Sequence, residues 1–179
     1  MENEIKKELE LIFKESNSSD ELFDAFRKAL DAKIKDADLY KTLLWNRALS
    51  SDEISMYAEK ICQEYPEFSF SIYFWVGKIF SSISTYGSHH EKAFEYFNKA
   101  SSIDRTSCEP FLAVAKLYSK ELNIPRIEKV VQIFKDGLES VKKKSELCFS
   151  LSKLFKRIGN IEKEKEYQKL GEQFQKEGS

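Results

Sequence analysis

Residues 111–118 read FLAVAKLY, and the same pattern occurs twice more at nearly constant spacing. Residues 73–80 read YFWVGKIF and residues 148–155 read CFSLSKLF, 38 residues before and 37 residues after it. Each stretch has an aromatic residue or Cys first, aliphatic residues fourth and seventh, a small residue fifth, Lys sixth and an aromatic residue last. A period of 20–50 residues is typical of repeat proteins, in which each unit buries its apolar face against its neighbours. The sequence therefore predicts an array of similar helical units.

Helix starts can be located between these stretches. Ser18, Ser50 and Ser88 are each followed by Glu three positions later. In this pattern the hydroxyl and the carboxylate satisfy unpaired backbone N–H groups of a new helix. Pro125 fits the first position of a further helix, and Asn160 is a favourable N-cap. We expect each of these residues to open the second helix of a two-helix unit.

Apolar or small residues recur along both kinds of helix with the spacing of a single helix face. In the second helices they are Leu22/Phe26/Ala29, Ile54/Ala58/Ile61, Ala93/Phe97/Ala100 and Val130/Phe134/Gly137. In the first helices they are Tyr73/Val76/Gly77/Phe80, Phe111/Val114/Ala115/Tyr118 and Cys148/Leu151/Ser152/Phe155. The small member of each set lets a neighbouring helix approach closely. Five helix pairs are expected, over residues 3–36, 37–68, 69–106, 107–143 and 144–179, and the second is the loosest because Arg47 stands where an aromatic residue is expected.

These inner positions resemble the tetratricopeptide repeat family, in which two antiparallel helices recur every 34 residues. The resemblance covers the whole chain and is strongest over residues 69–159, where Ile103-Asp104 and the Gly159-Asn160 turn also fit. It implies a single all-α domain, a right-handed α-α superhelix (solenoid) of about five repeats. Units three and four carry insertions relative to 34 residues.

The resemblance also implies a concave groove, lined in that family by the positions next to the inner stripe. Here these positions form an apolar ladder beside a lysine ladder, with two further cations in the last unit; the residues are Phe74, Lys78, Leu112, Lys116, Phe149, Lys153, Lys156 and Arg157. Lys41 and Trp45 occupy the same offsets in the second unit. We expect apolar anchors to set affinity for an acidic peptide and lysines to guide the encounter. The alternative is that the apolar members pack between helices and the lysines form a solvated face.

The implied function is a non-enzymatic adaptor or scaffold that binds a protein or peptide in this groove. One branch of the family holds the carboxylates of chaperone C-termini, but its Asn positions are occupied by Lys and other residues here, so that ligand is not expected. Two alternatives of other classes are open: a module for homo-oligomerisation, such as a homodimer, and an RNA-processing scaffold related to half-tetratricopeptide repeats. A net charge of −1 makes nucleic acid an unfavoured partner.

Composition limits the remaining possibilities. The N-terminal residues contain no apolar stretch typical of a signal peptide, and no uncharged apolar run approaches the length of a membrane-spanning helix. Cys62, Cys108 and Cys148 are far apart and form no C-x-x-C, which favours reduced core thiols in the cytoplasm, with the nucleus as an open alternative. His89 and His90 point to different sides of a helix start, so neither a metal site nor a cofactor is expected.

Overall fold

The computed structural model describes residues 2–83, 87–119 and 123–177, and these ranges form ten α-helices, one 3₁₀ turn and no β-strand. An isolated backbone bridge joins Ser119 and Ile124. The all-α fold expected from the sequence is confirmed. The chain divides into two compact units, residues 1–79 and residues 80–179, and the division falls inside helix α5.

The first unit contains five helices and the 3₁₀ turn. They are α1 (Glu2–Glu15), α2 (Ser19–Asp31), α3 (Ala37–Leu44), α4 (Ser51–Glu64), the turn Pro66–Phe68 and most of α5 (Ser69–Ser82). Helix α1 packs against both α2 and α3, and α3 packs against α4. Aromatic rings join the pairs, since the ring of Phe26 lies 4.6 Å from that of Tyr57 and 6.2 Å from that of Tyr40, between centroids.

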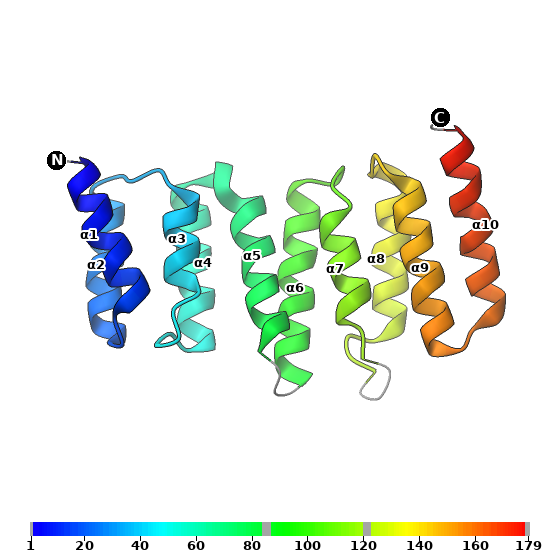
Figure 1. Cartoon of the computed structure of the whole chain (residues 1–179), viewed down its shortest axis with the longest axis horizontal. Helices are drawn as coiled ribbons and strands as arrows, with labels where there is room; N and C mark the ends of the chain where they lie inside the picture. The colour runs from blue at the N-terminus through cyan, green and yellow to red at the C-terminus, as the bar shows by residue number, and fades with distance from the viewer. Residues whose placement is uncertain (1, 84–86, 120–122, 178–179) are drawn as a thin grey trace. The chain divides into compact units, whose positions relative to one another are not determined.

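The second unit contains the end of α5 and five further helices. They are α6 (Gly87–Ile103), α7 (Glu109–Leu117), α8 (Ile127–Ser140), α9 (Lys144–Ile158) and α10 (Ile161–Glu177). Consecutive helices run antiparallel (Figure 1), and α7 contacts α6, α8 and α9. Helix α9 contacts α8 and α10 in turn. Within this unit, helices adjacent in sequence are therefore adjacent in space.

The inner stripes lie where the sequence predicts them. Every residue of the sets listed above is buried except Tyr73, which is half-buried. The Tyr73 hydroxyl donates a hydrogen bond to Glu59 Oε2 at 2.9 Å, so its polar end is satisfied at the edge of α4. One apolar face per helix thus accounts for the core of each unit.

Three of the expected helix starts are confirmed. Ser18 Oγ accepts from the Glu21 N–H, and Ser50 and Glu53 satisfy each other's backbone N–H groups reciprocally. Asn160 Oδ1 accepts from the N–H of Lys163, the third residue of α10. Ser88 falls inside α6, whose described part begins at Gly87, and its side chain lies outside the described residues.

The expected start at Pro125 is wrong by two residues, because α8 begins at Ile127. Ile124 is held in the bridge to Ser119, whose N–H donates to the Ile124 carbonyl at 2.9 Å. The Ile127 N–H donates instead to Asn123 Oδ1 at 3.3 Å. The bridge keeps the chain out of the helix until after Pro125.

The second helix pair is irregular because its first helix, α3, ends early. Helix α3 ends at Leu44, before Arg47 is reached, so Arg47 is exposed and has no inner position to fill. The side chain of Asn46 donates from Nδ2 to the carbonyls of Phe13 and Ser16, at 2.9 and 3.0 Å, and accepts from the Ala48 N–H. This amide fixes the end of α3 to the end of α1.

Helices α7 and α8 approach each other closely at a glycine. A Cβ atom on Gly137 of α8 would lie 2.7 Å from Cε1 of Phe111 in α7, well inside van der Waals contact. Both residues are buried. The pattern of one small residue on each inner stripe therefore has a direct steric reason at this position.

We expect Gly137→Ala to lower the free energy of unfolding by about 1–2 kcal/mol, because the added methyl overpacks the Phe111 ring and outweighs alanine's better helix propensity. Urea unfolding followed by circular dichroism measures this, with Lys135→Ala at an exposed position of the same helix as the control. An unchanged or more stable Gly137→Ala protein would contradict the packing described.

Candidate functional site

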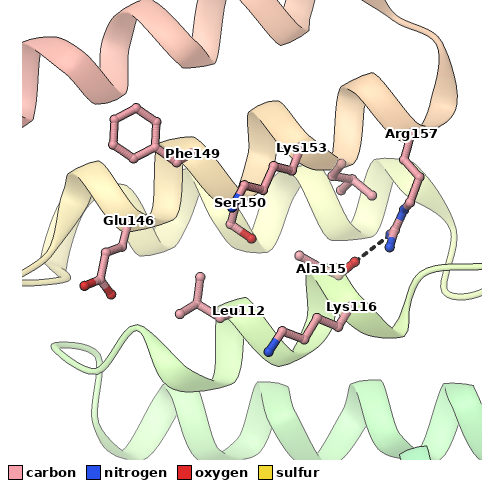
Figure 2. Close-up of a pocket in the computed structure, with 9 residues that line it drawn as sticks. Leu112, Ala115, Lys116, Glu146, Phe149, Ser150, Lys153 and Arg157 are labelled. Carbon is pink, nitrogen blue, oxygen red and sulfur yellow. Dashed lines mark hydrogen bonds between the residues drawn. The ribbon is translucent and has the colours of Figure 1, made fainter.

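A cavity of about 490 Å³ opens between α7 and α9 in the second unit. Its walls are Leu112, Ala115 and Lys116 from α7, and Glu146, Phe149, Ser150, Lys153, Leu154 and Arg157 from α9 (Figure 2). Five of the eight residues expected in the groove therefore meet at one cavity: Leu112, Lys116, Phe149, Lys153 and Arg157. The lining is mainly apolar between the two helices and carries three cations towards their C-terminal ends.

Two of these cations are uncompensated. Neither Lys116 nor Lys153 forms a hydrogen bond or an ion pair with any residue in the described ranges, and both are exposed. They project from neighbouring helices at the same cavity, so their fields add there. An anionic group entering from solvent would meet both ammonium groups without displacing a protein partner.

Arg157 has a different role from the one its position in the basic stripe predicts. Its Nη2 donates to the Ala115 carbonyl at 2.7 Å (Figure 2) and also to the Tyr118 carbonyl at 3.3 Å. The Ala115 carbonyl belongs to the last turn of α7, and Tyr118 is the C-cap residue that follows it; the C-terminal carbonyls of a helix lack partners inside the helix. A cation is favourable there because it opposes the negative end of the helix dipole. Arg157 thus links α9 to the end of α7 and closes one end of the cavity.

Phe149 stands at the rim of the cavity and not at its centre. A Cβ atom on Gly171 of α10 would lie 2.6 Å from the Phe149 ring, so the ring packs directly on α10. In Figure 2 the ring points from α9 towards α10, whereas Leu112 points from α7 into the space between the helices. Leu112 is therefore the better anchor for a ligand, and changing Phe149 would also disturb the α9–α10 contact.

The other expected groove residues lie elsewhere. Lys156 is not part of the cavity lining, and its Nζ lies 3.9 Å from Glu164 Oε1 on α10. Phe74 and Lys78 belong to the first unit, where Lys78 Nζ lies 4.4 Å from the centroid of the Phe74 ring. The Phe70 ring stacks on the Phe74 ring, with 6.0 Å between the ring centroids. In that unit the apolar and the basic groove positions lie on the same helix, α5, and their side chains contact each other.

Four lining residues were not among the expected groove positions: Ala115, Glu146, Ser150 and Leu154. Glu146 and Ser150 share the face of α9 that carries Lys153 and Arg157, at helical spacings of four, three and four residues. Extending the stripe backwards by two turns would have found them. Glu146 forms an exposed ion pair with Lys143 at 3.0 Å and is the one carboxylate among the nine lining residues.

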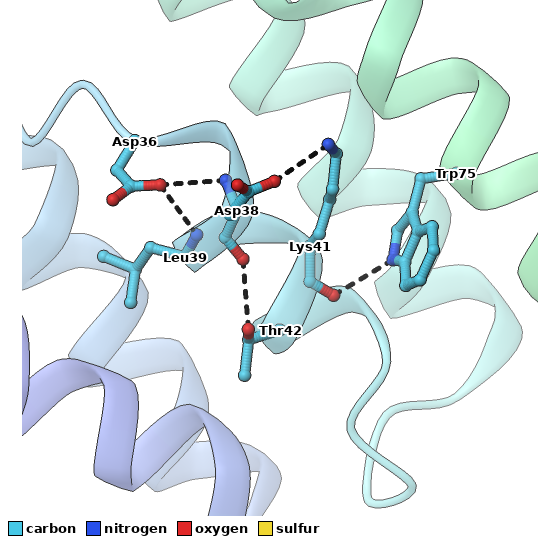
Figure 3. Close-up of polar contacts among 6 residues, drawn as sticks. All are labelled: Asp36, Asp38, Leu39, Lys41, Thr42 and Trp75. Carbon is cyan, nitrogen blue, oxygen red and sulfur yellow. Dashed lines mark hydrogen bonds and ion pairs between the residues drawn. The ribbon is translucent and has the colours of Figure 1, made fainter.

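The region around the start of α3 in the first unit is polar, and its charged side chains are paired with one another. Asp36 caps α3 by accepting from the N–H groups of Asp38 and Leu39 (Figure 3), and it also pairs with Lys6. The hydrogen bond and charge of Lys6 lower the pKa of Asp36. Lys41, at the offset of the lysine ladder, pairs with Asp38 at 3.0 Å, so its charge is already compensated.

Two indoles lie next to each other beyond that cap. Trp75 Nε1 donates to the Lys41 carbonyl at 3.1 Å, which seats α5 on the end of α3 (Figure 3). The ring of Trp45 lies 5.8 Å from that of Trp75 and is 53% exposed. Trp45 also borders a smaller cavity of about 340 Å³, with Lys14, Asn17 and Arg47 in its lining.

Charge is distributed unevenly between the units. Residues 1–79 contain 11 Lys and Arg and 16 Asp and Glu, whereas residues 80–179 contain 18 and 14. The first unit therefore has a net charge of −5 and the second a net charge of +4, which the total of −1 conceals. The cationic cavity thus lies in the unit whose overall field attracts anions.

The thiols and other reactive groups give no second site in the described ranges. Cys62, Cys108 and Cys148 are buried. Burial raises the pKa of Cys108 and raises that of Cys148 to about 11. No three His, Cys, Asp or Glu residues among those described are grouped so that they could hold a metal ion. His89 is half-buried against Phe80, with ring centroids 6.1 Å apart.

No family model matches the chain, and no curated protein matches its sequence. Every helix in the described ranges is too short or too polar to cross a bilayer. The candidate site is therefore defined by its own geometry.

We expect Arg157→Ala to lower the free energy of unfolding by about 1 kcal/mol, since two carbonyls of α7 lose a charged donor. Lys153→Ala, four residues earlier on the same face, should change it by less than about 0.5 kcal/mol because that side chain has no described partner. Urea unfolding of both variants measures the difference. Equal effects would contradict the assigned role of Arg157.

The buried thiols should be inert in the folded protein. A raised pKa keeps Cys148 protonated at about pH 8, and only the thiolate reacts readily with aromatic disulfide reagents. Colour development with such a reagent should therefore follow unfolding, and three thiols should react once urea unfolds the chain. Rapid reaction of Cys148 without urea, located by peptide mass analysis, would be inconsistent with its burial.

Proposed function

We propose that the protein is a non-enzymatic binding module that holds a peptide segment of another protein in the cavity between α7 and α9. The observation that carries the proposal is the pairing of a half-buried Leu112 with two uncompensated cations, Lys116 and Lys153, around one open cavity of about 490 Å³. Pockets of this size accept a few side chains. Apolar contact supplies most of the affinity in such a site, and exposed charges select among partners.

We propose further that the helix pairs form a superhelix of the tetratricopeptide type. Support comes from the buried stripes at the repeated positions and from the order of packing inside each unit, where α1 contacts α3 and α7 contacts α9. In such arrays the first helices of successive pairs lie side by side, and the surface between them is the usual place for a ligand. The cavity occupies that place between α7 and α9.

The proposed partner is an acidic segment with an apolar anchor. The net charge of +4 on residues 80–179 favours approach of an anionic partner. One anchor side chain against Leu112 and Leu154 would contribute about 1.5–3 kcal/mol if fully buried, whereas each exposed Lys–carboxylate pair contributes about 0–1 kcal/mol. Loss of the anchor contact should therefore weaken binding more than loss of one lysine.

The test is a selection of peptides from a displayed random library on the immobilised full-length protein. Among the selected peptides, Leu112→Ala should weaken binding by about fivefold to thirtyfold and Lys153→Glu by a smaller factor. The matched control is Leu11→Ala, which removes a leucine that is 63% exposed on α1, outside this cavity. Selected peptides that bind all four proteins equally, while circular dichroism shows them folded, would refute the cavity as the binding site.

A further inference from the structure

The charges around the cavity are ordered along it. Glu146 lies in the first turn of α9, whereas Lys153 and Arg157 lie two and three turns further on, and Lys116 joins them from α7. Figure 2 shows Glu146 at one end and Arg157 at the other, with Leu112 and Ser150 between them, and the side chains of Lys116 and Lys153 extend from the Arg157 end towards the middle. The cavity therefore has a negative pole, an apolar middle and a positive pole.

The two ends of the cavity differ in how much of their charge is already paired within the protein. Arg157 already donates to two carbonyls through Nη2, and its remaining N–H groups have no partner among the described residues. Among the residues that the structure describes, Glu146 pairs with Lys143 alone, at the exposed surface where a ligand cation competes on nearly equal terms. Each pole can thus take a charge of the opposite sign from the ligand.

On this basis we infer that the cavity selects a peptide with a fixed order of charge: a basic residue at the Glu146 end, an apolar residue at Leu112, and one or two acidic residues at the Lys116–Lys153 end. This inference rests on the proposed function. A uniformly acidic segment is disfavoured, because its second carboxylate would lie beside Glu146.

The helix geometry sets the spacing of the motif. Glu146 precedes Lys153 by seven residues and Arg157 by eleven, so the backbone positions of the two poles are about 10–16 Å apart along α9 at 1.5 Å per residue. An extended peptide advances about 3.3 Å per residue. The basic and acidic residues of the ligand are therefore about three to five positions apart, with the apolar residue between them.

The experiment compares the charge patterns that different baits enrich from the same displayed library. Wild-type protein should enrich sequences with Lys or Arg three to five positions from Asp or Glu, across an apolar residue. Glu146→Lys should enrich sequences that are acidic on both sides of the apolar residue. Glu146→Gln, which keeps the side-chain length, should lose the basic preference without gaining an acidic one. Glu139→Lys, with the same charge change at an exposed position of α8 outside the cavity, should behave as wild type.

The outcomes separate the two proposals. The charge order would be overturned if the wild-type protein enriched peptides that are acidic on both sides of the apolar residue. It would also be overturned if the wild type and Glu146→Lys enriched the same pattern. In either case the proposal that the cavity binds a peptide would still hold. A selection that enriches no sequence would overturn the proposed function and the inference with it. For individual peptides, we expect exchange of the basic residue for an acidic one to weaken wild-type binding by about twofold to fivefold.

Discussion

The close approach of helices at a small residue is the constraint on which the rest of the second unit depends. Gly137 lets α8 meet the Phe111 ring of α7, and Gly171 lets α10 meet the Phe149 ring of α9. In both cases a side chain larger than hydrogen would need space that the aromatic ring occupies. Because interiors are packed close to the density of organic crystals, such a contact determines which helix neighbours are possible. The pairs α7–α8 and α9–α10 are thereby defined before any surface feature is considered.

The cavity is a consequence of how these pairs meet. Phe149 is drawn towards α10 by the space at Gly171, so it does not fill the region between α7 and α9. Arg157 spans that region at one end and holds the last turn of α7 through the carbonyls of Ala115 and Tyr118. The remaining surface carries Leu112 and two uncompensated lysines. The cavity thus depends on three features together: the close packing of Phe149 on α10, the contact of Arg157 with the end of α7, and the excess of positive charge.

Much of this arrangement could be predicted because helix periodicity is a local property. The stripes from Leu22 to Phe155 are buried as expected, and Ser50 and Asn160 cap the helices that they were expected to cap. The misassigned start at Pro125 depends on a bridge between Ser119 and Ile124, which periodicity does not register. Part of the cavity lining could be predicted for the same reason. Spacing placed Leu112, Lys116 and Lys153 on one side of their helices, but it did not distinguish a lysine without a partner from an arginine that caps a neighbouring helix.

The packing contact at Gly137 can be tested most directly by a double-mutant cycle. The free energies of unfolding of the wild type, Gly137→Ala, Phe111→Leu and the double variant are compared by urea denaturation. If the methyl group of the alanine and the Phe111 ring compete for one space, the smaller leucine should relieve the overpacking. The double variant should then be more stable than the sum of the single effects by about 1 kcal/mol or more. Additivity within about 0.3–0.5 kcal/mol would show that Gly137 and Phe111 do not share that space, and would contradict the account.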